Sequence, residues 1–533
     1  MIRISEFWKQ NGHPPKKGVY NYPTGRIGDI GPMCEERCSI LRIVFMVGLC
    51  AFILLGCAIM PEVSRSTHVG ESGPVGSCAS FFELLDQRTK EAGALDPGAF
   101  RVKNYPYLRV NRFLASFRKQ VEDRVTFAAW VDQMQKLDQN ARRHEITNLA
   151  ADYKDAPTSE DERDELFSKV VACGNLLRNS DFQEIEQREE LPRRVVVPDE
   201  YISLRRFFGL YPLSSLFVAH GVSEWHQRAH KSFSLGPPVD WYTIRYVPEE
   251  SDNLLAVDEI ISQTQRDALG IPRYSPEAKE ALFRMYAPIW QVETKGNFDR
   301  MGSPFWTHAG TLDVDGKQPV TYTLLSYTRF KSEILTQLNY IIWFPSRPKE
   351  GALDLYGGLL DGLDYRVTLD RKGKPLLYES MHNCGCYYKS FPTKGLKVLE
   401  KISYAEPPLI LEAPELNPSL ESMTVAMESR THYVQHLYPS PRAIPAENIF
   451  YPLVDYGELL SLPLPKGGSK SMFCEDSIAP GSQRLERWIL WPTGVLSPGA
   501  MRQWGRHAVA FVGKRHFDDP YFMEKMFVET GSQ

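Results

Sequence analysis

The chain has 533 residues, and because single hydrophobic cores stop growing at about 250 to 300 residues, we expect two folded domains. Hydrophobic residues make up 43% of it and charged residues 24%, values that are typical of a packed protein and exclude a disordered or fibrous one. The 62 basic and 66 acidic residues give a net charge of -4, so no excess of positive charge is available for a phosphate backbone, and we expect no nucleic-acid partner.

An uncharged apolar segment runs from residue 43 to residue 60. Its length is marginal for a helix that spans a membrane, which needs about 20 apolar residues, and it also fits the core of a signal peptide. The motif Leu54-Leu55-Gly56-Cys57 near its end resembles the lipobox of bacterial lipoproteins. The resemblance implies that residues 1–60 hold a leader, that Cys57 carries lipid and that everything before Cys57 is removed.

An uncleaved single-span anchor is the alternative, with Cys57 as an ordinary small residue inside the helix, and Met33 is an alternative start. Both interpretations hold the rest of the chain at a membrane on its extracytoplasmic side, which for a lipoprotein is the periplasmic side of the bacterial envelope. We therefore expect the membrane as a partner, through the lipid or the apolar segment, besides an unidentified protein or envelope partner.

The exported part is predicted to begin with a flexible tether, residues 61–77, which contain Gly, Ser and Pro but little apolar sequence. Residues 78–195 are predicted to form a helical domain, because apolar side chains such as Phe127 and Trp130 recur at helical spacing. Ser159, which precedes an acidic turn, indicates the start of another helix.

Residues 196–270 connect this helical region to the rest of the chain. They contain an apolar run after Tyr211 that is too short and too broken to span a membrane. We interpret the segment as a buried connection between the two domains. A surface that contacts lipid is the alternative interpretation.

Residues 271–533 are predicted to form a β-rich domain, because β-branched and aromatic residues dominate their apolar runs. Two runs that flank the Gly-containing loop 371–374 have the pattern of a β-hairpin. The fold class is therefore α+β, with a helical N-terminal region followed by a β-rich C-terminal domain. Further strands are expected at residues 320–327, 338–344, 488–491 and 508–512.

A cluster of metal-ligand side chains follows the hairpin directly. If its second strand continues, the two-residue period places His382, Cys384 and Cys386 on one face. Such ligands suit zinc or copper, and three protein ligands with an open position are typical of catalytic zinc. We therefore predict zinc or copper here, with a water or one more histidine as the fourth ligand. The candidate histidines are His432, His436, His507 and His516.

Disulfides are the alternative use of the cysteines, because exported proteins keep them. Cys78 and Cys173 both lie in the helical region and are candidates for one disulfide. Cys384 or Cys386 would then pair with Cys474, which leaves one thiol unpaired. A redox role of Cys384 and Cys386 is a third interpretation, and it requires a reactive thiolate.

The sequence leaves the activity open. It contains no nucleophile elbow, phosphate loop or dinucleotide-binding glycine motif, so we expect no nucleotide cofactor. Asp354, Asp361, Asp364 and Asp370 lie close to glycines and are interpreted as turn formers, with a calcium-like or acid/base loop as the alternative. The working interpretation is an exported, membrane-anchored lipoprotein that binds metal in the cell envelope. The alternatives are a metal-dependent hydrolase of envelope material and a non-catalytic binding or assembly protein with structural disulfides.

Overall fold

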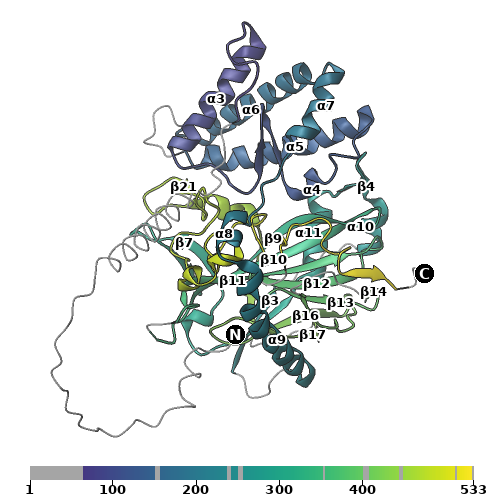
Figure 1. Cartoon of the computed structure of the whole chain (residues 1–533), viewed down its shortest axis with the longest axis vertical. Coiled ribbons are helices and arrows are strands. Elements are labelled where there is room, and N and C mark those ends of the chain that lie inside the picture. The colour runs from purple at the N-terminus through teal and green to yellow at the C-terminus, as the bar shows by residue number, and fades with distance from the viewer. Residues whose placement is uncertain are drawn as a thin grey trace, which may run out of the picture. The chain divides into compact units, whose positions relative to one another are not determined.

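The computed structural model describes residues 64–149, 157–236, 242–249, 256–351, 354–399, 407–442, 448–509 and 513–530 (Figure 1). The predicted leader and its lipidation site Cys57 lie outside these residues. The chain from Pro61 to Gln533 forms one compact unit. Its helices lie mostly in the N-terminal half and its strands mostly in the C-terminal half, which confirms the α+β prediction.

The N-terminal part of this unit consists of helices around a short β-hairpin. Its helices are α3 (Pro74–Glu91), α4 (Arg112–Ala115), α5 (Arg124–Thr147), α6 (Glu160–Asp181) and α7 (Ile185–Arg194), and its hairpin pairs β1 (Phe100–Val102) with β2 (Tyr105–Val110). The hydroxyl of Ser159 accepts a hydrogen bond from the amide of Glu162, so α6 begins where the sequence predicts a helix. The sequence did not indicate the hairpin, because β2 is buried at every position and lacks the alternation of a half-exposed strand.

A disulfide between Cys78 and Cys173 joins α3 to α6 and confirms the predicted pairing. The helices enclose an apolar core in which Phe82, Trp130 and Leu177 are fully buried. The loop between Cys78 and Cys173 is closed by the bond also in the unfolded chain. The disulfide therefore stabilises the helical part chiefly by lowering the entropy of the unfolded state.

An ion-pair network of arginines and carboxylates is buried in the same helical part. Arg109 faces Asp138 at 3.1 Å and Glu145 at 2.6 Å, and Arg142 faces Asp138 at 2.8 Å and Asp86 at 2.9 Å. Burial alone would raise the pKa of Glu145, but Arg109 and its neighbouring arginines lower it to about 2. The network ties α3, β2 and α5 together.

The structure differs from the predicted tether in residues 64–77. Ser64 is buried and donates a hydrogen bond from Oγ to the carbonyl of Val102 at 2.6 Å. His68 places Nε2 2.8 Å from the carboxylate of Asp181, and α3 already begins at Pro74. The polar side chains of this segment find partners on the helical part, so low apolar content did not make it a free linker.

The connecting segment 196–270 begins with two helices, α8 (Ser203–Phe208) and α9 (Tyr211–Leu235), and later contributes the strand Thr243–Pro248 and the helix Val257–Gln263. The C-terminal half of α9 packs on the β-rich part through Trp225, Ala229 and Phe233. The interpretation as a buried connection is wrong for α8, because Phe207 and Phe208 are exposed. Among the residues described, no helix combines the length and the apolar composition that crossing a membrane requires.

Two sheets form the β-rich part (Figure 1). The larger has the strand order β15-β13-β12-β11-β10-β9-β19, antiparallel from β9 to β13 with a parallel strand at each edge. Its strands are β9 (Thr321–Phe330), β10 (Glu333–Arg347), β11 (Gly358–Leu369), β12 (Pro375–His382), β13 (Lys389–Pro392), β15 (Leu409–Ile410) and β19 (Leu453–Asp455). The smaller has the order β17-β16-β6-β3-β18, with β3 (Thr243–Pro248), β6 (Ile289–Glu293), β16 (Glu421–Met427), β17 (Val434–Pro441) and β18 (Ile449–Tyr451).

The main core belongs to one face of the larger sheet. Tyr340, Tyr365 and Phe344 from this face are fully buried together with Trp290 of the smaller sheet and Leu282 of α11 (Pro276–Tyr286).

The remaining elements are short. They are α10 (Val257–Gln263), β4 (Gln265–Arg266), β5 (Pro272–Arg273), η1 (Asn297–Asp299), β7 (Ser303–Trp306), β8 (Leu312–Asp315), β14 (Leu396–Val398), η2 (Tyr456–Leu460), β20 (Leu462–Pro463), β21 (Ser469–Lys470), η3 (Leu485–Trp488), η4 (Trp491–Thr493) and β22 (Phe527–Glu529).

Most of the predicted strands are confirmed. β9 and β10 cover the runs 320–327 and 338–344, and β11 and β12 form the predicted hairpin around Gly373, whose φ is +79°. The strand predicted at 488–491 is wrong: the chain forms 3-10 turns there, in which the amide of Ile489 donates to the carbonyl of Glu486. Of the strand predicted at residues 508–512, Ala508 forms an isolated bridge with His516, and residues 510–512 lie outside the described residues.

Candidate functional site

The predicted metal-ligand segment is a turn rather than a strand. β12 ends at His382, where the amide of Gly385 donates to the carbonyl of His382 at 2.8 Å and the amide of His382 to the carbonyl of Cys386 at 3.0 Å. Gly385 has a φ of +86°, and a Cβ there would lie 2.3 Å from the carbonyl oxygen of Ala508. The prediction of three ligands on one strand face is therefore wrong, because a close backbone approach at Gly385 folds the chain back.

The two cysteines of this turn are buried free thiols. A hydrogen bond between them, together with burial, raises the pKa of Cys386 well above its ordinary value. Cys474 is exposed and is joined to neither of them, so the predicted second disulfide is not formed. A buried thiol with a raised pKa is a poor nucleophile, which argues against the redox interpretation in this state.

His382 instead begins a cluster of two histidines and two aspartates, which we call the His–Asp cluster. Nδ1 of His382 lies 3.4 Å from one oxygen of Asp361, and the other oxygen of Asp361 lies 2.8 Å from Nδ1 of His432. Nε2 of His432 lies 3.3 Å from Asp299. All four side chains are buried.

The sheets bring these residues together from four distant parts of the chain. Asp361 lies on β11 and His382 at the end of β12, so the hairpin places them side by side. Asp299 ends η1, and His432 lies between β16 and β17. Phe344 of β10 stacks on the ring of His432 with 3.9 Å between ring centroids, which fixes the plane of the imidazole.

The two histidines carry different charges. Burial lowers the pKa of His382 although Asp361 opposes this, so His382 is neutral. Burial would also lower the pKa of His432, but its contacts with Asp299 and Asp361 raise it, which favours the charged form of His432. For Asp361, burial favours a raised pKa, and the two imidazoles outweigh it and lower the pKa. Asp361 is therefore an ionised carboxylate between one neutral and one charged imidazole.

The backbone around the cluster is strained. Leu360, Tyr387, Arg430 and His432 have φ values of 57°, 59°, 70° and 51°. These values lie in the left-handed region, which residues other than glycine rarely adopt. Each such residue costs about 1 to 3 kcal/mol, and strain of this kind concentrates at functional sites. Four strained residues at one cluster favour a functional role.

Two partly buried tyrosine rings, the partly buried Arg347 and the buried Lys389 form a group near His382 that we call the rim, in which Nζ of Lys389 donates to the carbonyl of Val434. The ring centroids of Tyr387 and Tyr433 lie 5.1 and 5.5 Å from that of His382. The guanidinium of Arg347 lies 5.3 Å from the centroid of Tyr433, and the ammonium of Lys389 lies 5.9 Å from it. Burial lowers the pKa of Lys389 to about 8 against the opposing effect of Glu428. The rim therefore combines a permanent positive charge with an amine that titrates near neutral pH.

The other predicted ligands lie elsewhere. His436 stacks on Phe233 with 5.9 Å between centroids, His507 faces the carbonyl of Asn383 at 3.0 Å, and His516 faces Asp199 at 3.4 Å. Of the predicted ligands, the structure joins only His382 and His432 through a shared carboxylate. Across the described part of the chain, no three His, Cys, Asp or Glu side chains are grouped so as to hold a metal ion. Zinc or copper at His382 stays a prediction.

The sequence did not single out Asp299, Arg347 or Lys389, and it interpreted Asp361 as a turn former. Asp361 lies inside β11, so that interpretation is wrong. A buried carboxylate in a strand is rare unless it is paired, and a strand assignment for residues 358–369 would have drawn attention to it.

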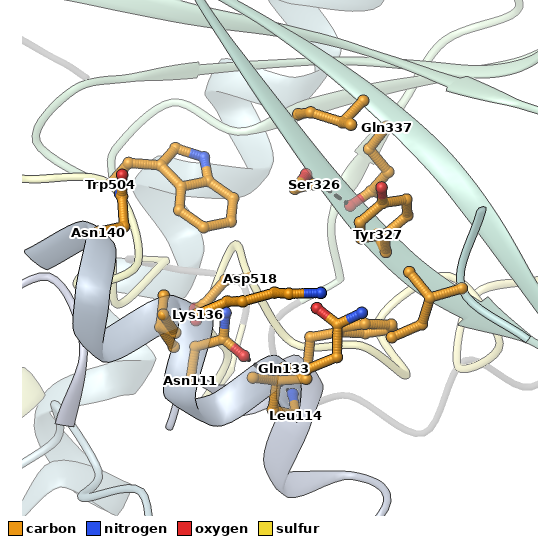
Figure 2. Close-up of a pocket in the computed structure, with 14 residues that line it drawn as sticks. Asn111, Leu114, Gln133, Lys136, Asn140, Ser326, Tyr327, Gln337, Trp504 and Asp518 are labelled. Atoms are coloured by element: carbon orange, nitrogen blue, oxygen red, sulfur yellow. Dashed lines mark hydrogen bonds between the residues drawn. The ribbon is translucent and has the colours of Figure 1, made fainter. Parts of the chain in front are cut away.

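A separate cavity of about 290 Å³ lies between α5 and strands β9 and β10 (Figure 2). It is lined by polar, charged, aliphatic and aromatic side chains, which include Asn111, Gln133, Lys136, Gln337 and Trp504. Several are already engaged: Gln133 donates to Asp267 at 2.7 Å, and Lys136 pairs with Asp132 at 2.8 Å. The cavity holds none of the predicted metal ligands and no buried histidine, so the His–Asp cluster is the stronger candidate site.

Comparison with known proteins gives no match: no family model matches the sequence, no curated protein matches it, and no solved structure matches the fold. Function therefore has to be inferred from the chemistry of the site itself.

Proposed function

We propose that the protein is a membrane-anchored extracytoplasmic enzyme in which His382 acts as the general base on a phosphate ester. The state of His382 supports this. Its ring is buried, Asp361 faces Nδ1, and Nε2 has no hydrogen-bond partner among the residues described. A neutral imidazole that a carboxylate orients, with its second nitrogen free to accept a proton, is the arrangement that general-base catalysis requires.

The charge of the rim favours an anionic substrate. Arg347 and Lys389 lie on the same tyrosine ring, that of Tyr433, and Arg347 is close enough to His382 to lower its pKa further. A planar guanidinium matches two oxygens of a phosphate group, and an ammonium adds a compact charge. These two cations would stabilise the negative charge that develops on the phosphoryl oxygens during transfer.

The proposed reaction is hydrolysis. Nε2 of His382 takes a proton from water while the water oxygen forms a bond to phosphorus, and the bond between phosphorus and the ester oxygen breaks. The leaving oxygen then receives the proton from His382, so the imidazole returns to its neutral form. Asp361 holds the Nδ1 proton in place and stabilises the imidazolium that forms in between.

Two features support the extracytoplasmic, anchored location. The apolar segment 43–60, with its lipobox-like end at Cys57, predicts attachment to a membrane. The disulfide between Cys78 and Cys173 suits an oxidising compartment, because cytosolic thiols are kept reduced.

Turnover of model esters by the purified chain tests the proposal. The panel is p-nitrophenyl phosphate, bis(p-nitrophenyl) phosphate and the uncharged p-nitrophenyl acetate. We expect turnover of a phosphate ester, lost by about 100-fold or more in His382→Gln, because removing a general base costs about this much. His308→Gln is the matched control, since His308 is exposed in the turn between β7 and β8. Preference for the acetate, no turnover, or equal losses in both variants would reject the proposal.

The unpartnered Nε2 of His382 also favours a second candidate, a hydrolase that holds zinc or copper at this nitrogen. Metal analysis of the two variants separates it from the first. Metal retained by the wild type and by His308→Gln but lost by His382→Gln supports the metal enzyme, whereas equal metal contents in all three reject it.

A further inference from the structure

An exposed apolar patch covers α8, the start of α9 and the segment from η3 to η4. Phe207 and Phe208 of α8 are 75% and 62% exposed, and Leu213 of α9 is 60% exposed. Trp488 and Ile489 add exposed side chains of 64% and 53%. Leu204 and Leu210 belong to the same patch and are also exposed.

The two segments that carry the patch are packed against each other. The amide of Ile202 donates to the carbonyl of Gly494 at 2.8 Å, and Arg206 donates from its guanidinium to the carbonyl of Thr493 at 2.8 Å. A Cβ on Gly209 would lie 2.5 Å from Cβ of Pro492, so the backbone of α8 touches η4 directly. Figure 1 shows α8 and α9 on the near side of the unit. The two segments that carry the exposed apolar side chains are therefore direct neighbours.

Such a group of large apolar side chains is unusual on a solvent-exposed surface. Leu204, Phe207 and Phe208 stand at the i, i+3 and i+4 positions of one helical turn, the spacing that normally marks a buried face. Single exposed apolar residues need no explanation, but a group of large ones marks an interaction site.

The two segments that carry the patch contribute mostly positive charges of their own. Arg205, Arg206 and Arg487 belong to the same two segments, and the guanidinium of Arg487 lies 4.7 Å from the ring centroid of Trp488. Between residues 203 and 213 and between residues 485 and 494, the only acidic residue is Glu486, which is buried. The patch therefore offers phenylalanine, leucine and tryptophan side chains with arginines at their side.

We infer that this patch binds the surface of an anionic lipid bilayer. Aromatic and leucine side chains that insert among acyl chains, with arginines at headgroup level, are the composition of an interfacial membrane contact. A second copy of the chain fits less well, because a twofold interface would bring the arginines of both copies together without carboxylates to pair them.

The sequence upstream agrees with this occupant. The apolar segment predicted to attach to the membrane ends at Met60, and Ser64 is already buried on the folded unit. Four residues reach at most about 14 Å. The folded unit would therefore stay close to the bilayer, where even a weak patch is continually presented to lipid. The inference does not depend on the chemistry of the His–Asp cluster.

Vesicle binding tests the inference. The chain from Pro61 onward forms a compact unit of its own, so it can be studied without the apolar segment. We expect it to sediment with vesicles of phosphatidylcholine and phosphatidylglycerol, to bind pure phosphatidylcholine less, and to bind less at high salt. The pair Phe207→Ser and Phe208→Ser should weaken binding by about tenfold or more, because two large apolar side chains no longer enter the bilayer. Arg205→Gln with Arg487→Gln should remove the preference for phosphatidylglycerol.

The pair Val125→Ser and Leu420→Ser is the matched control, since both side chains are exposed to a similar extent outside the patch. It should bind vesicles as the wild type does, and circular dichroism should show all variants folded. Absence of binding to vesicles that contain phosphatidylglycerol, or an equal loss in the control pair, would overturn the inference. So would a dimer in sedimentation velocity that the Phe207 and Phe208 substitutions dissociate, because a second copy would then occupy the patch.

Discussion

The molecule buries charged side chains in two clusters that differ in how closely their charges are paired. In the ion-pair network of the helical part, Arg109 and Arg142 each contact two carboxylates within 3.1 Å. In the His–Asp cluster of the β-rich part, the contacts of Asp361 with His382 and of His432 with Asp299 are longer, 3.4 and 3.3 Å, and Nε2 of His382 has no partner among the described residues.

The backbone differs in the same way. No residue of the ion-pair network has a positive φ, whereas His432 and three residues close to the His–Asp cluster do. Matched charges on regular helices and strands are what a structural cluster needs. Strained backbone and a free nitrogen cost stability, and a fold keeps them where they serve another purpose. The comparison therefore assigns stability to the first cluster and chemistry to the second.

Arg109→Leu should have the largest effect on stability. The substitution leaves Glu145 without its closest cation and removes one of the two arginines that face Asp138. Removing one partner of a buried ion pair costs about 3 to 5 kcal/mol. The free energy of unfolding in urea measures it. Arg65→Leu breaks an exposed pair with Glu83 at 3.1 Å and should cost less than about 1 kcal/mol. Similar losses in both variants would contradict a structural role for the network.

The two regions should also respond to pH with opposite signs. The pKa of Glu145 is about 2 instead of 4.5, so its stability contribution is present above pH 4.5 and lost as the pH falls toward 2. Burial raises the pKa of Glu486, beside Arg347, from 4.5 to about 7, so its contribution is present below pH 4.5 and lost as the pH rises through 7. Each of these two pKa shifts corresponds to a change of about 3 kcal/mol in the free energy of unfolding.

Unfolding free energies of Glu145→Gln and Glu486→Gln, measured across pH, check both signs. The difference between wild type and Glu145→Gln should shrink as the pH falls below 4.5. Glu486→Gln should gain stability relative to the wild type as the pH rises from 4.5 to 7. Curves that run parallel to the wild type would show that these carboxylates keep ordinary pKa values.

Features with local signals were predictable from the sequence. The start of α6 follows from Ser159 and the acidic residues after it, and the hairpin from a Gly-containing loop between two runs that contain apolar residues. The disulfide followed from counting cysteines in an exported chain. Each depends on neighbours along the chain or on composition, which a single sequence records directly.

The His–Asp cluster was not predictable in this way. His432 and Asp361 are 71 residues apart, and they meet only because the smaller sheet packs on the larger one. His382 was singled out for the wrong geometry, since the left-handed Gly385 ends the strand that was expected to align it with two cysteines. The exposure of Phe207 was missed for the same reason: an apolar helix face indicates burial until the packing shows that nothing covers it.

His382→Gln should have the smallest effect on stability of the variants proposed in the two clusters. His382 is neutral, its one polar side-chain contact is 3.4 Å long, and a glutamine amide can still donate to Asp361, so the loss should stay below about 1 kcal/mol. Turnover of a phosphate ester should nevertheless fall by about 100-fold or more. His507→Leu is the informative comparison, because His507 is also buried and neutral but faces the carbonyl of Asn383 at 3.0 Å. It should lose about 0.5 to 1.5 kcal/mol through the lost hydrogen bond while turnover is kept, because the carbonyl of Asn383 still accepts from the amide of Arg502. If His382→Gln proves as destabilising as His507→Leu, His382 is a structural residue. The assignment of stability to the ion-pair network and of chemistry to the His–Asp cluster then fails.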